Sequence, residues 1–325
     1  MNDRTLEVRN LNVTIRTDRR EVRPVNDVSL DVPAGSIVGI VGESGCGKSM
    51  TARAVMGLLP YSGKVAGGTV RLCGREITAL PEKERRKLRG SEISMIFQEP
   101  MTSLNPVIKV GKQVEETIRL HTECSREEAK EKTLAMFREV EIPEAETRYH
   151  CYPHQLSGGL RQRVMIAMAM VCKPKLLIAD EPTTALDVTV EAQILNLLEH
   201  LRDAGTSVLI ISHNLGVIAR VSDYVYVMYA GRIVEQAATE ALFERPTHPY
   251  TQGLFRSVNS LREGNATLET IPGVVPNLLR LPAGCSFSLR CGQCGADCEK
   301  NMPELLETEP GHRVRCFLTE KEGAE

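Results

Sequence analysis

The chain has 325 residues, of which 42% are hydrophobic and 25% charged, and its 40 Lys and Arg against 42 Asp and Glu leave a formal net charge of -2. This composition excludes a disordered chain or a collagen-like repeat, and it lacks the basic excess of a dedicated nucleic-acid binder. The longest apolar runs, such as 164–172, are far shorter than the roughly 20 residues that cross a bilayer, and residues 1–10 hold no apolar signal core. We therefore expect a cytosolic protein of about two domains, in which any membrane role comes through partners.

Residues 1–60 are predicted to hold strands followed by one strand-to-helix turn. Alternating apolar residues from Leu6 to Ile15 indicate a β-rich start. The almost wholly apolar run at 37–41 predicts a buried strand. A helix should follow from about Lys48 to Leu59, because a proline and a glycine-rich stretch come directly after it.

A mainly helical stretch is expected between about residues 91 and 174. Ser125 and Glu128 have the spacing of a capping box, in which the serine accepts from the third helical N–H and the glutamate reaches back. The basic run 83–89, just upstream, is interpreted as a solvated face, because the chain as a whole is close to neutral.

From residue 175 to about 235, short apolar strands alternate with helices. The predicted strands are 176–179, 207–211 and 224–228, and the predicted helices are 190–202 and 215–221. Alternation of this kind favours a parallel sheet with helices packed on it. The chain is thus predicted to be an α/β protein with an N-terminal antiparallel β subdomain and a helical insert.

Residues 241–325 are rich in Pro, Gly and Cys, and we expect them to form a separate small module. Five of the ten cysteines lie in the last 41 residues, namely Cys285, Cys291, Cys294, Cys298 and Cys316. Because a reducing cytosol disfavours structural disulfides, this cluster indicates metal ligands.

Residues 42–49 carry the firmest local signal. Their sequence matches the phosphate-binding pattern G-x-x-x-x-G-K-[ST], and it lies after a predicted strand and before a predicted helix. Glycines let backbone N–H groups wrap phosphates, and a helix N-terminus adds partial positive charge. Lys48 is expected to neutralise the β- and γ-phosphates, and Ser49 to bind Mg²⁺. The residues predicted to bind the nucleotide here are Gly42, Glu43, Ser44, Gly45, Cys46, Gly47, Lys48, Ser49 and Met50.

A second predicted strand, 176–179, ends in two carboxylates, Asp180 and Glu181. The first is expected to bind Mg²⁺, directly or through water. The second should lie beside the γ-phosphate, where it orients or deprotonates water. An apolar run that ends in Asp-Glu is a weak signal alone, and it gains weight from the phosphate-binding loop upstream.

With these motifs, the chain resembles the ATP-binding subunit of an ABC transporter. Residues 156–163 (LSGGLRQR) resemble the ABC signature, and their Ser157, Gly158 and Gly159 open a predicted helix. The N-terminus of this helix is a second anion-binding site, and in that family it faces the ATP held by the partner subunit. The other matching positions are Gln98 in the Q-loop, residues 185–187 with Asp187 in the D-loop, and His213 as the switch histidine. All six motifs occur in the family's order, between about residues 5 and 235.

The resemblance implies a P-loop ATPase domain over residues 1–240, with a helical subdomain near 91–174. It implies ATP and Mg²⁺ as cofactors. The residues that it implies for hydrolysis are Lys48, Gln98, Glu181 and His213, and those for Mg²⁺ are Ser49, Gln98 and Asp180. In the family, each ATP site combines the P-loop of one subunit with the signature of the other. Because this chain has one P-loop and one signature, it should need a second ATPase subunit.

The sequence departs from the family pattern at three places. Leu160 ends the signature where Gln or Met is usual, and Asn214 stands where Asp is common. The aromatic residue that stacks on adenine is missing, since its place falls at Ile15 and no aromatic precedes Tyr61. Adenine is therefore expected to be held by aliphatic contact, which leaves the nucleotide selectivity open.

Two segments narrow the resemblance to the oligopeptide, dipeptide and nickel importer branch: residues 98–106 (QEPMTSLNP) and 245–251 (RPTHPYT). Residues 161–169 are closer to the D-type ATPase of dipeptide permeases than to its F-type partner. The resemblance implies a non-identical second ATPase, two transmembrane permease subunits, an extracytoplasmic substrate-binding protein, no nucleic acid, and a peripheral place on the cytoplasmic face of the membrane. The rival class is a soluble ABC ATPase in DNA repair or translation, whose usual paired cassettes, coiled coils or basic arms are not visible here.

Cys285, Cys291, Cys298 and Cys316 resemble the C-terminal cysteine set of this branch, which can hold a [4Fe–4S] cluster. Four thiolates suit iron–sulfur or zinc alike. Cys294 adds a C-x2-C step with Cys291 that zinc sites favour. An iron–sulfur cluster, zinc and no metal all stay open. A metal would staple a loop-rich segment that has few large apolar residues.

Overall fold

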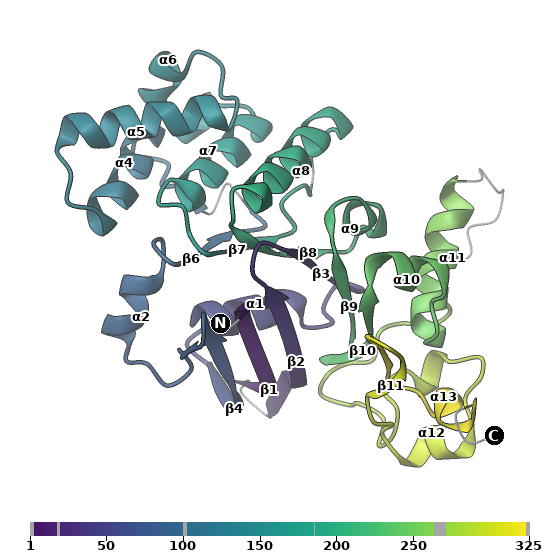
Figure 1. The fold of residues 1–325 in the computed structure, drawn as a ribbon. Helices are drawn as coiled ribbons and strands as arrows, with labels where there is room; N and C mark the ends of the chain where they lie inside the picture. The colour runs from purple at the N-terminus through teal and green to yellow at the C-terminus, as the bar shows by residue number, and fades with distance from the viewer. Residues whose placement is uncertain (1–2, 18–19, 100–102, 185, 263–270, 323–325) are drawn as a thin grey trace. The chain divides into compact units, whose positions relative to one another are not determined.

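The computed structural model describes residues 3–17, 20–99, 103–184, 186–262 and 271–322. It divides the chain into two compact units, each built from strands with helices beside them (Figure 1). Unit 1 comprises residues 1–5, 32–36 and 79–210, and unit 2 comprises residues 6–31, 37–78 and 211–325.

Unit 1 is built on short parallel strands. β6 (Ile93–Ile96) pairs in parallel with β7 (Leu176–Asp180), with Ile93 opposite Leu176, and β8 (Ser207–Ser212) begins beside β7. Every residue of β6 and β7 is buried, as their mostly apolar sequences predict for strands covered on both faces. The described helices of this unit are α2 (Glu82–Leu88), α4 (Val110–His121), α5 (Arg126–Glu139), α6 (Ala145–Tyr149), α7 (Gly158–Met170), α8 (Val188–Asp203) and the 3₁₀ turn η1 (Pro153–Gln155).

The helical insert is present where the sequence places it, with α4, α5 and α7 gathered together in unit 1 (Figure 1). The predicted capping box opens α5. The Glu128 N–H donates to Ser125 Oγ at 3.2 Å, and the Ser125 N–H donates to Glu128 Oε2 at 2.8 Å. Val114 of α4, Phe137 of α5 and Val164 of α7 are fully buried, so these helices share one core.

Unit 2 contains the expected antiparallel β subdomain. Its strand order is β2-β1-β4-β5, formed by β1 (Arg4–Arg16), β2 (Glu21–Pro33), β4 (Gly63–Leu72) and β5 (Arg75–Glu76). β4 pairs antiparallel with both β1 and β5. The apolar side chains that alternate along β1, including Leu6 and Val8, are fully buried, which confirms the period-2 pattern of the sequence.

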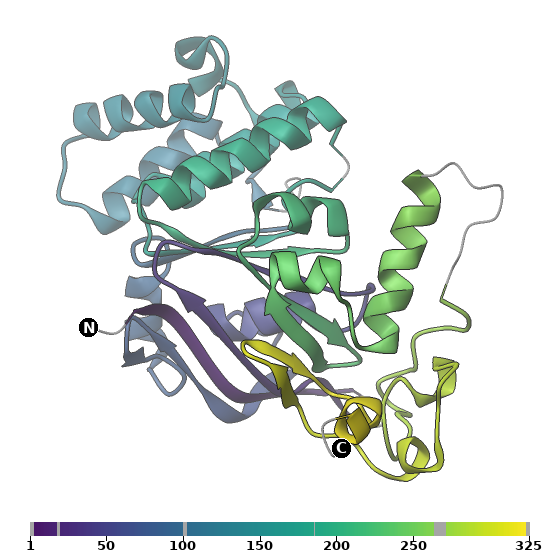
Figure 2. The same cartoon turned by 45° about the vertical axis from the view of Figure 1, so that its right-hand side comes forward.

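A second set of strands in unit 2 joins the two ends of the sequence. Their order is β11-β12-β10-β9-β3, formed by β3 (Ile37–Val41), β9 (Tyr224–Tyr229), β10 (Arg232–Ala238), β11 (Leu306–Glu309) and β12 (His312–Val314). β3 pairs in parallel with β9, and the other neighbours are antiparallel. Figure 2 shows the yellow β11–β12 hairpin beside the green strands of this sheet. The C-terminal segment therefore extends the same sheet that holds the strand before the phosphate-binding loop.

The described helices of unit 2 are α1 (Lys48–Met56), α9 (Leu215–Val221), α10 (Thr239–Glu244), α11 (Pro249–Arg262), α12 (Ala296–Lys300), α13 (Phe317–Glu322) and the 3₁₀ turn η2 (Ser288–Arg290). α1 is shorter than predicted, because Gly57 takes a left-handed conformation with φ 65° and caps the helix. Among the described residues, no helix is long and apolar enough to cross a bilayer. The domain boundary at residue 240 stays a prediction.

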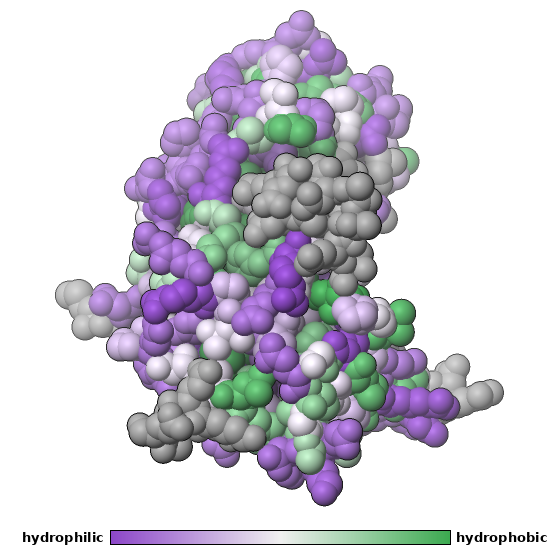
Figure 3. Space-filling model, turned by 90° about the vertical axis from the view of Figure 1, so that its right-hand side faces the viewer, coloured by the Kyte–Doolittle hydropathy of each residue, from purple (hydrophilic) through white to green (hydrophobic). Residues whose placement is uncertain are grey.

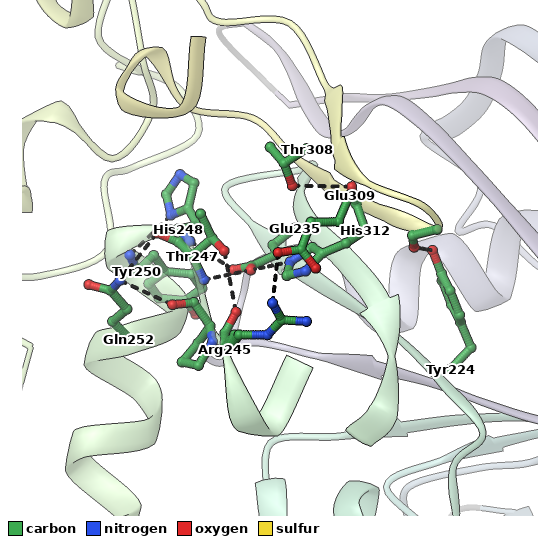
Figure 4. A network of polar contacts seen from close by, with 12 residues as sticks. Tyr224, Glu235, Arg245, Thr247, His248, Tyr250, Gln252, Thr308, Glu309 and His312 are labelled. Atoms are coloured by element: carbon green, nitrogen blue, oxygen red, sulfur yellow. Dashed lines mark hydrogen bonds and ion pairs between the residues drawn. The ribbon is translucent and has the colours of Figure 1, made fainter. Parts of the chain in front are cut away.

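A buried carboxylate on β10 ties segments of unit 2 together (Figure 4). Glu235 is fully buried, and its two oxygens accept hydrogen bonds from the N–H groups of Thr247 at 2.7 Å and His248 at 2.9 Å. His312 Nε2 of β12 lies 2.8 Å from Glu235 Oε1. A buried carboxylate must be matched by partners of this kind. The RPTHPYT segment 245–251 thus has a structural role, because it fixes the start of α11 to β10.

Glu235→Gln should lower the free energy of unfolding by about 2–3 kcal/mol. The glutamine amide has one oxygen and one NH₂ group. The NH₂ group would face at least one of the buried groups that now donate to the carboxylate, and that donor would lose its acceptor. Urea denaturation of the full chain measures the change. The matched control is Glu307→Gln in β11, whose carboxylate pairs with Arg313 at the surface and should contribute little. Equal losses in the two variants would contradict this account.

Candidate nucleotide site

The phosphate-binding loop of unit 2 runs from β3 into α1 and is enclosed by backbone. Gly42 and Gly47 have φ values of 155° and 107°. A Cβ on Gly42 would lie 2.2 Å from the Met228 carbonyl oxygen of β9, and one on Gly47 would lie 2.1 Å from the Pro24 carbonyl oxygen of β2. No side chain larger than hydrogen fits at either position. The packing therefore explains why the motif has glycine at both.

The loop closes around its lysine. Lys48 is 5% exposed, and its Nζ donates to the carbonyl oxygens of Gly42 at 2.7 Å and Glu43 at 3.0 Å. Cys46 is fully buried, its carbonyl oxygen accepts from the Gly231 N–H at 2.8 Å, and burial raises the pKa of its thiol. Cys46 thus packs inside the loop as a small buried residue. Of the other predicted contacts, Ser44 and Gly45 are exposed, and Ser49 and Met50 are partly exposed.

Two residues of the C-terminal segment reach this loop, and the sequence patterns do not reveal either of them. The Glu43 N–H donates to the Tyr250 hydroxyl of α11 at 2.8 Å. Arg290 of η2 forms a two-pronged ion pair with the Glu43 carboxylate, with Nη1–Oε2 and Nη2–Oε1 distances of 2.7 and 3.1 Å. The ion pair joins residues 247 positions apart and the bond to Tyr250 joins residues 207 positions apart, and no local motif marks such contacts.

In unit 1, the predicted carboxylates stand at the end of β7. Asp180 is 2% exposed, and Glu181 follows it with a φ of 50°, which is unusual for a residue other than glycine. Gln98 Nε2 donates to Glu181 Oε2 at 2.8 Å, and the Thr184 hydroxyl donates to the same oxygen at 2.9 Å. The structure thus brings together Gln98 and Glu181, which the sequence predicts separately, and it adds Thr184.

The signature segment opens α7 as expected. Ser157 is its N-cap and accepts a hydrogen bond from the Leu160 N–H at 3.4 Å, while Gly158 is its first residue. Farther along the helix, the buried Gln162 Nε2 donates to the Pro182 carbonyl oxygen at 2.7 Å. This bond ties the signature helix to the residues that directly follow Glu181. Gly159 comes close to α8, since a Cβ placed on it would lie 3.3 Å from Val190 Cγ1.

Asp187 and Asn214 both act as helix caps. The Asp187 side chain accepts from the Val190 N–H at 2.9 Å and opens α8. Asn214 opens α9, where its Oδ1 accepts from the Gly216 N–H at 2.9 Å. Because Asn and Asp cap equally well, the Asn in place of Asp keeps this local role. His213 directly precedes Asn214 and is exposed. Residues 100–102 and Ala185 of the predicted motifs lie outside the described residues.

The expected adenine position at Ile15 lies in β1 of unit 2, opposite Gly63 of β4. A groove beside it is lined by residues of both strands, including Thr14 and Arg16, and by Tyr61. Tyr61 precedes the register partner of Ile15 by two residues, and its side chain is fully exposed. The antiparallel register therefore puts an aromatic residue next to the expected adenine position, although it comes 46 positions later in the sequence. Aliphatic contact with adenine remains a prediction.

The cysteines that resemble a ligand set line one small cavity: Cys285, Cys291, Cys298 and Cys316. In the described part of the chain no cysteine forms a disulfide bond, and Cys294 is exposed and is not part of the cavity lining. Burial raises the pKa of Cys285 to about 11 and also raises the pKa of Cys291 and Cys316. Four gathered thiols fit a thiophilic metal chemically. However, among the described residues no group of three or more His, Cys, Asp or Glu has a metal-binding arrangement.

The surface around the C-terminal segment carries both hydrophobic and hydrophilic side chains. Val274 and Leu289 are exposed at 86% and 75%. Figure 3 shows green hydrophobic residues among purple hydrophilic ones on the lower half of the face that carries the C-terminal segment. The cysteine cavity thus lies in a segment that leaves some of its apolar side chains in solvent.

A glycine-rich loop between a buried strand and a helix, a strand that ends in two carboxylates and a capped signature helix define a P-loop nucleotide-binding cassette. Residues 25–184 match the ABC transporter family, and residues 234–298 match the family described as oligopeptide/dipeptide transporter, C-terminal region. The chain belongs to the ATP-binding proteins of ABC transporters.

Relatives resemble the chain over nearly its whole length. It is 51% identical to a probable peptide ABC transporter ATP-binding protein of Sinorhizobium fredii, covering 97% of this chain and 95% of that protein. It is 52% identical to the oligopeptide transport ATP-binding protein OppD of Salmonella typhimurium, covering 96% and 93%. Among solved structures, the dimeric ATP-binding cassette MJ0796 with ADP and Pi has a TM-score of 0.66 at 26% identity, covering 72% of this chain and 98% of that one.

Proposed function

We propose that this chain is the ATP-hydrolysing subunit of a membrane importer for peptides or related small solutes. The observation that carries the proposal is the combination of an ABC cassette with the oligopeptide/dipeptide C-terminal region in one chain. Relatives that match nearly the whole chain are described as peptide or oligopeptide transport proteins. The rival function in DNA repair or translation is not favoured by these relatives.

In the proposed reaction, ATP is hydrolysed to ADP and phosphate. Lys48 neutralises the β- and γ-phosphates. Ser49 and Asp180 would hold Mg²⁺, which would supply further charge neutralisation there. Glu181 orients the attacking water. Its hydrogen bonds to Gln98 and Thr184 support this role, because they fix the direction of the carboxylate. Gln98 would also help to hold Mg²⁺, and His213 completes the contacts to the γ-phosphate.

Glu181→Gln should leave ATP binding near the wild-type level and lower the turnover of the assembled transporter by about 100-fold or more, since the amide is a far weaker base. Phosphate release and binding of labelled ATP measure the two effects. Lys48→Ala should instead lose ATP binding. Glu131→Gln, at an exposed position of α5, is the matched control and should behave as wild type. Normal turnover of the Glu181 variant would refute the assignment.

We also propose that the chain works as a pair with a second, non-identical ATPase on two transmembrane permease subunits. Ser157, Gly158 and Gly159 open the 13-residue helix α7, whose N-terminus offers partial positive charge to the ATP held by the second subunit. The surface around residues 98–106 transmits closure of the pair to the permeases. An extracytoplasmic binding protein supplies the solute, and the chain lies on the cytoplasmic face of the membrane as a peripheral subunit.

A tagged chain purified from detergent-solubilised native membranes should bring down a second ABC ATPase and two multi-span proteins. Mass spectrometry of the co-purifying chains is the measurement, and the tag alone is the control. A captured binding protein would then narrow the class of solute. Recovery of soluble DNA or ribosome factors without any membrane protein would contradict the transport role and leave only the ATPase chemistry.

For the cysteine cavity, we propose a structural metal held by Cys285, Cys291, Cys298 and Cys316, either a [4Fe–4S] cluster or zinc. The support is the common cavity and the chemistry of the four thiols. Such a group would cross-link a loop-rich segment. No step of ATP hydrolysis needs its redox chemistry.

Replacing any one of these four cysteines by serine should lower the metal content of the purified chain, while Cys294→Ser should leave it unchanged. Elemental analysis with an assay for acid-labile sulfide distinguishes iron–sulfur from zinc. The Cys294 variant is a matched control because that thiol is exposed and outside the cavity. A wild-type chain without bound iron or zinc, purified under strict exclusion of oxygen, would refute the proposal.

A further inference from the structure

The ion pair between Arg290 and Glu43 joins the C-terminal segment to the phosphate-binding loop through two hydrogen bonds. The Arg290 side chain is 4% exposed, and that of Glu43 is 28% exposed. Both guanidinium nitrogens at the tip meet the two carboxylate oxygens in the parallel geometry that arginine offers and lysine does not. The hydrogen bond to Glu43 raises the pKa of Arg290, so the guanidinium is charged at any physiological pH.

Other contacts of Arg290 fix its guanidinium in place. Its Nε donates to the Pro272 carbonyl oxygen at 2.9 Å, Nη2 donates to the Ile271 carbonyl oxygen at 3.3 Å, and Nη1 donates to the Tyr229 hydroxyl at 3.4 Å. The guanidinium carbon also lies 5.9 Å from the centre of the Tyr229 ring. A side chain held at so many points offers Glu43 a rigid partner and does not adapt to wherever the glutamate lies.

The main chain of Glu43 is held on the same side. Its N–H donates to the Tyr250 hydroxyl, and the Tyr250 ring packs against Tyr229 and Phe287 with centroid distances of 4.6 and 5.5 Å. The Glu43 carbonyl oxygen accepts from Lys48 Nζ. One residue therefore links the C-terminal segment, through its carboxylate and N–H, to the loop lysine, through its carbonyl oxygen.

We propose that Arg290 is a positioning residue for the phosphate-binding loop. Acting through Glu43, it holds residues 42–49 in the conformation from which Lys48 and the loop N–H groups bind phosphates, so the C-terminal segment sets the affinity for ATP. The inference rests on the proposed function, since ATP affinity is its readout. It gives the second residue of the loop a role that phosphate contact alone does not explain.

The surroundings of Arg290 connect this role to the cysteine cavity. Arg290 ends the 3₁₀ turn η2 and is followed directly by Cys291. The Ser288 N–H, at the start of that turn, donates to the Cys285 carbonyl oxygen at 3.0 Å. Two cavity cysteines therefore bracket the turn that carries Arg290.

The test is a double-mutant cycle on the full chain, with the Kd for ATP and Mg²⁺ measured by equilibrium binding of labelled ATP. Arg290→Ala and Glu43→Ala should each raise the Kd by about tenfold, and the double variant should be no weaker than Glu43→Ala alone, because residues of one contact couple strongly. Arg290→Lys, which keeps the charge and loses the fork, should restore part of the affinity. Arg313→Ala is the matched control, since that arginine pairs with Glu307 at the surface.

Two results would overturn the inference: a Kd for Arg290→Ala within twofold of wild type, or a double variant whose loss is the product of the two single losses. Thermal unfolding of each variant separates a loss of folded protein from a loss of affinity in the folded chain. If Arg290→Ala does not fold, the same cycle with Arg290→Lys and Glu43→Gln decides by the same criteria. If wild type and Lys48→Ala both fail to bind ATP, the proposed function fails. If wild type binds ATP, Lys48→Ala does not, and the Arg290 variants have the Kd of wild type, the positioning role alone fails.

Discussion

The close approach of two carbonyl groups to the phosphate-binding loop is the constraint on which the rest of unit 2 depends. Met228 of β9 approaches Gly42 on one side, and Pro24 of β2 approaches Gly47 on the other. The loop can take its shape only when the parallel partner of β3 and a strand of the antiparallel sheet are both in place. Two neighbouring parts of the sequence and a distant one, β9, must therefore fold together before the loop lysine reaches the carbonyl oxygens of Gly42 and Glu43.

Local sequence patterns predict the helices and strands well, because apolar periodicity and helix caps act within a few residues. The strand at 37–41 and the helix at 215–221 match the sequence-based bounds, and the capping box at Ser125 forms as expected. α1 ends early because the left-handed Gly57 stops it before the proline does. The four cysteines line one cavity, but among the described residues they do not form a group with a metal-binding arrangement.

Long-range contacts were beyond the sequence patterns. The ion pair of Arg290 with Glu43 and the hydrogen bond from the Glu43 N–H to the Tyr250 hydroxyl both depend on tertiary packing. Arg290 belongs to no recognisable motif, and the sequence marks its partner Glu43 only as one residue of the phosphate-binding loop. The RPTHPYT segment was a marker of resemblance in the sequence. In the fold it is the segment whose N–H groups bind the buried Glu235.

The same buried carboxylate has a consequence for how the chain is made. β12, which pairs with β10, supplies His312 to Glu235, and it is synthesised about 75 residues after β10. Until it emerges, β10 presents an open edge and a carboxylate that lacks one of its partners. Open sheet edges invite pairing between chains, and incomplete intermediates are prone to aggregate. Chains whose synthesis stops before residue 312 should therefore be poor folders, even though they contain every nucleotide-binding motif.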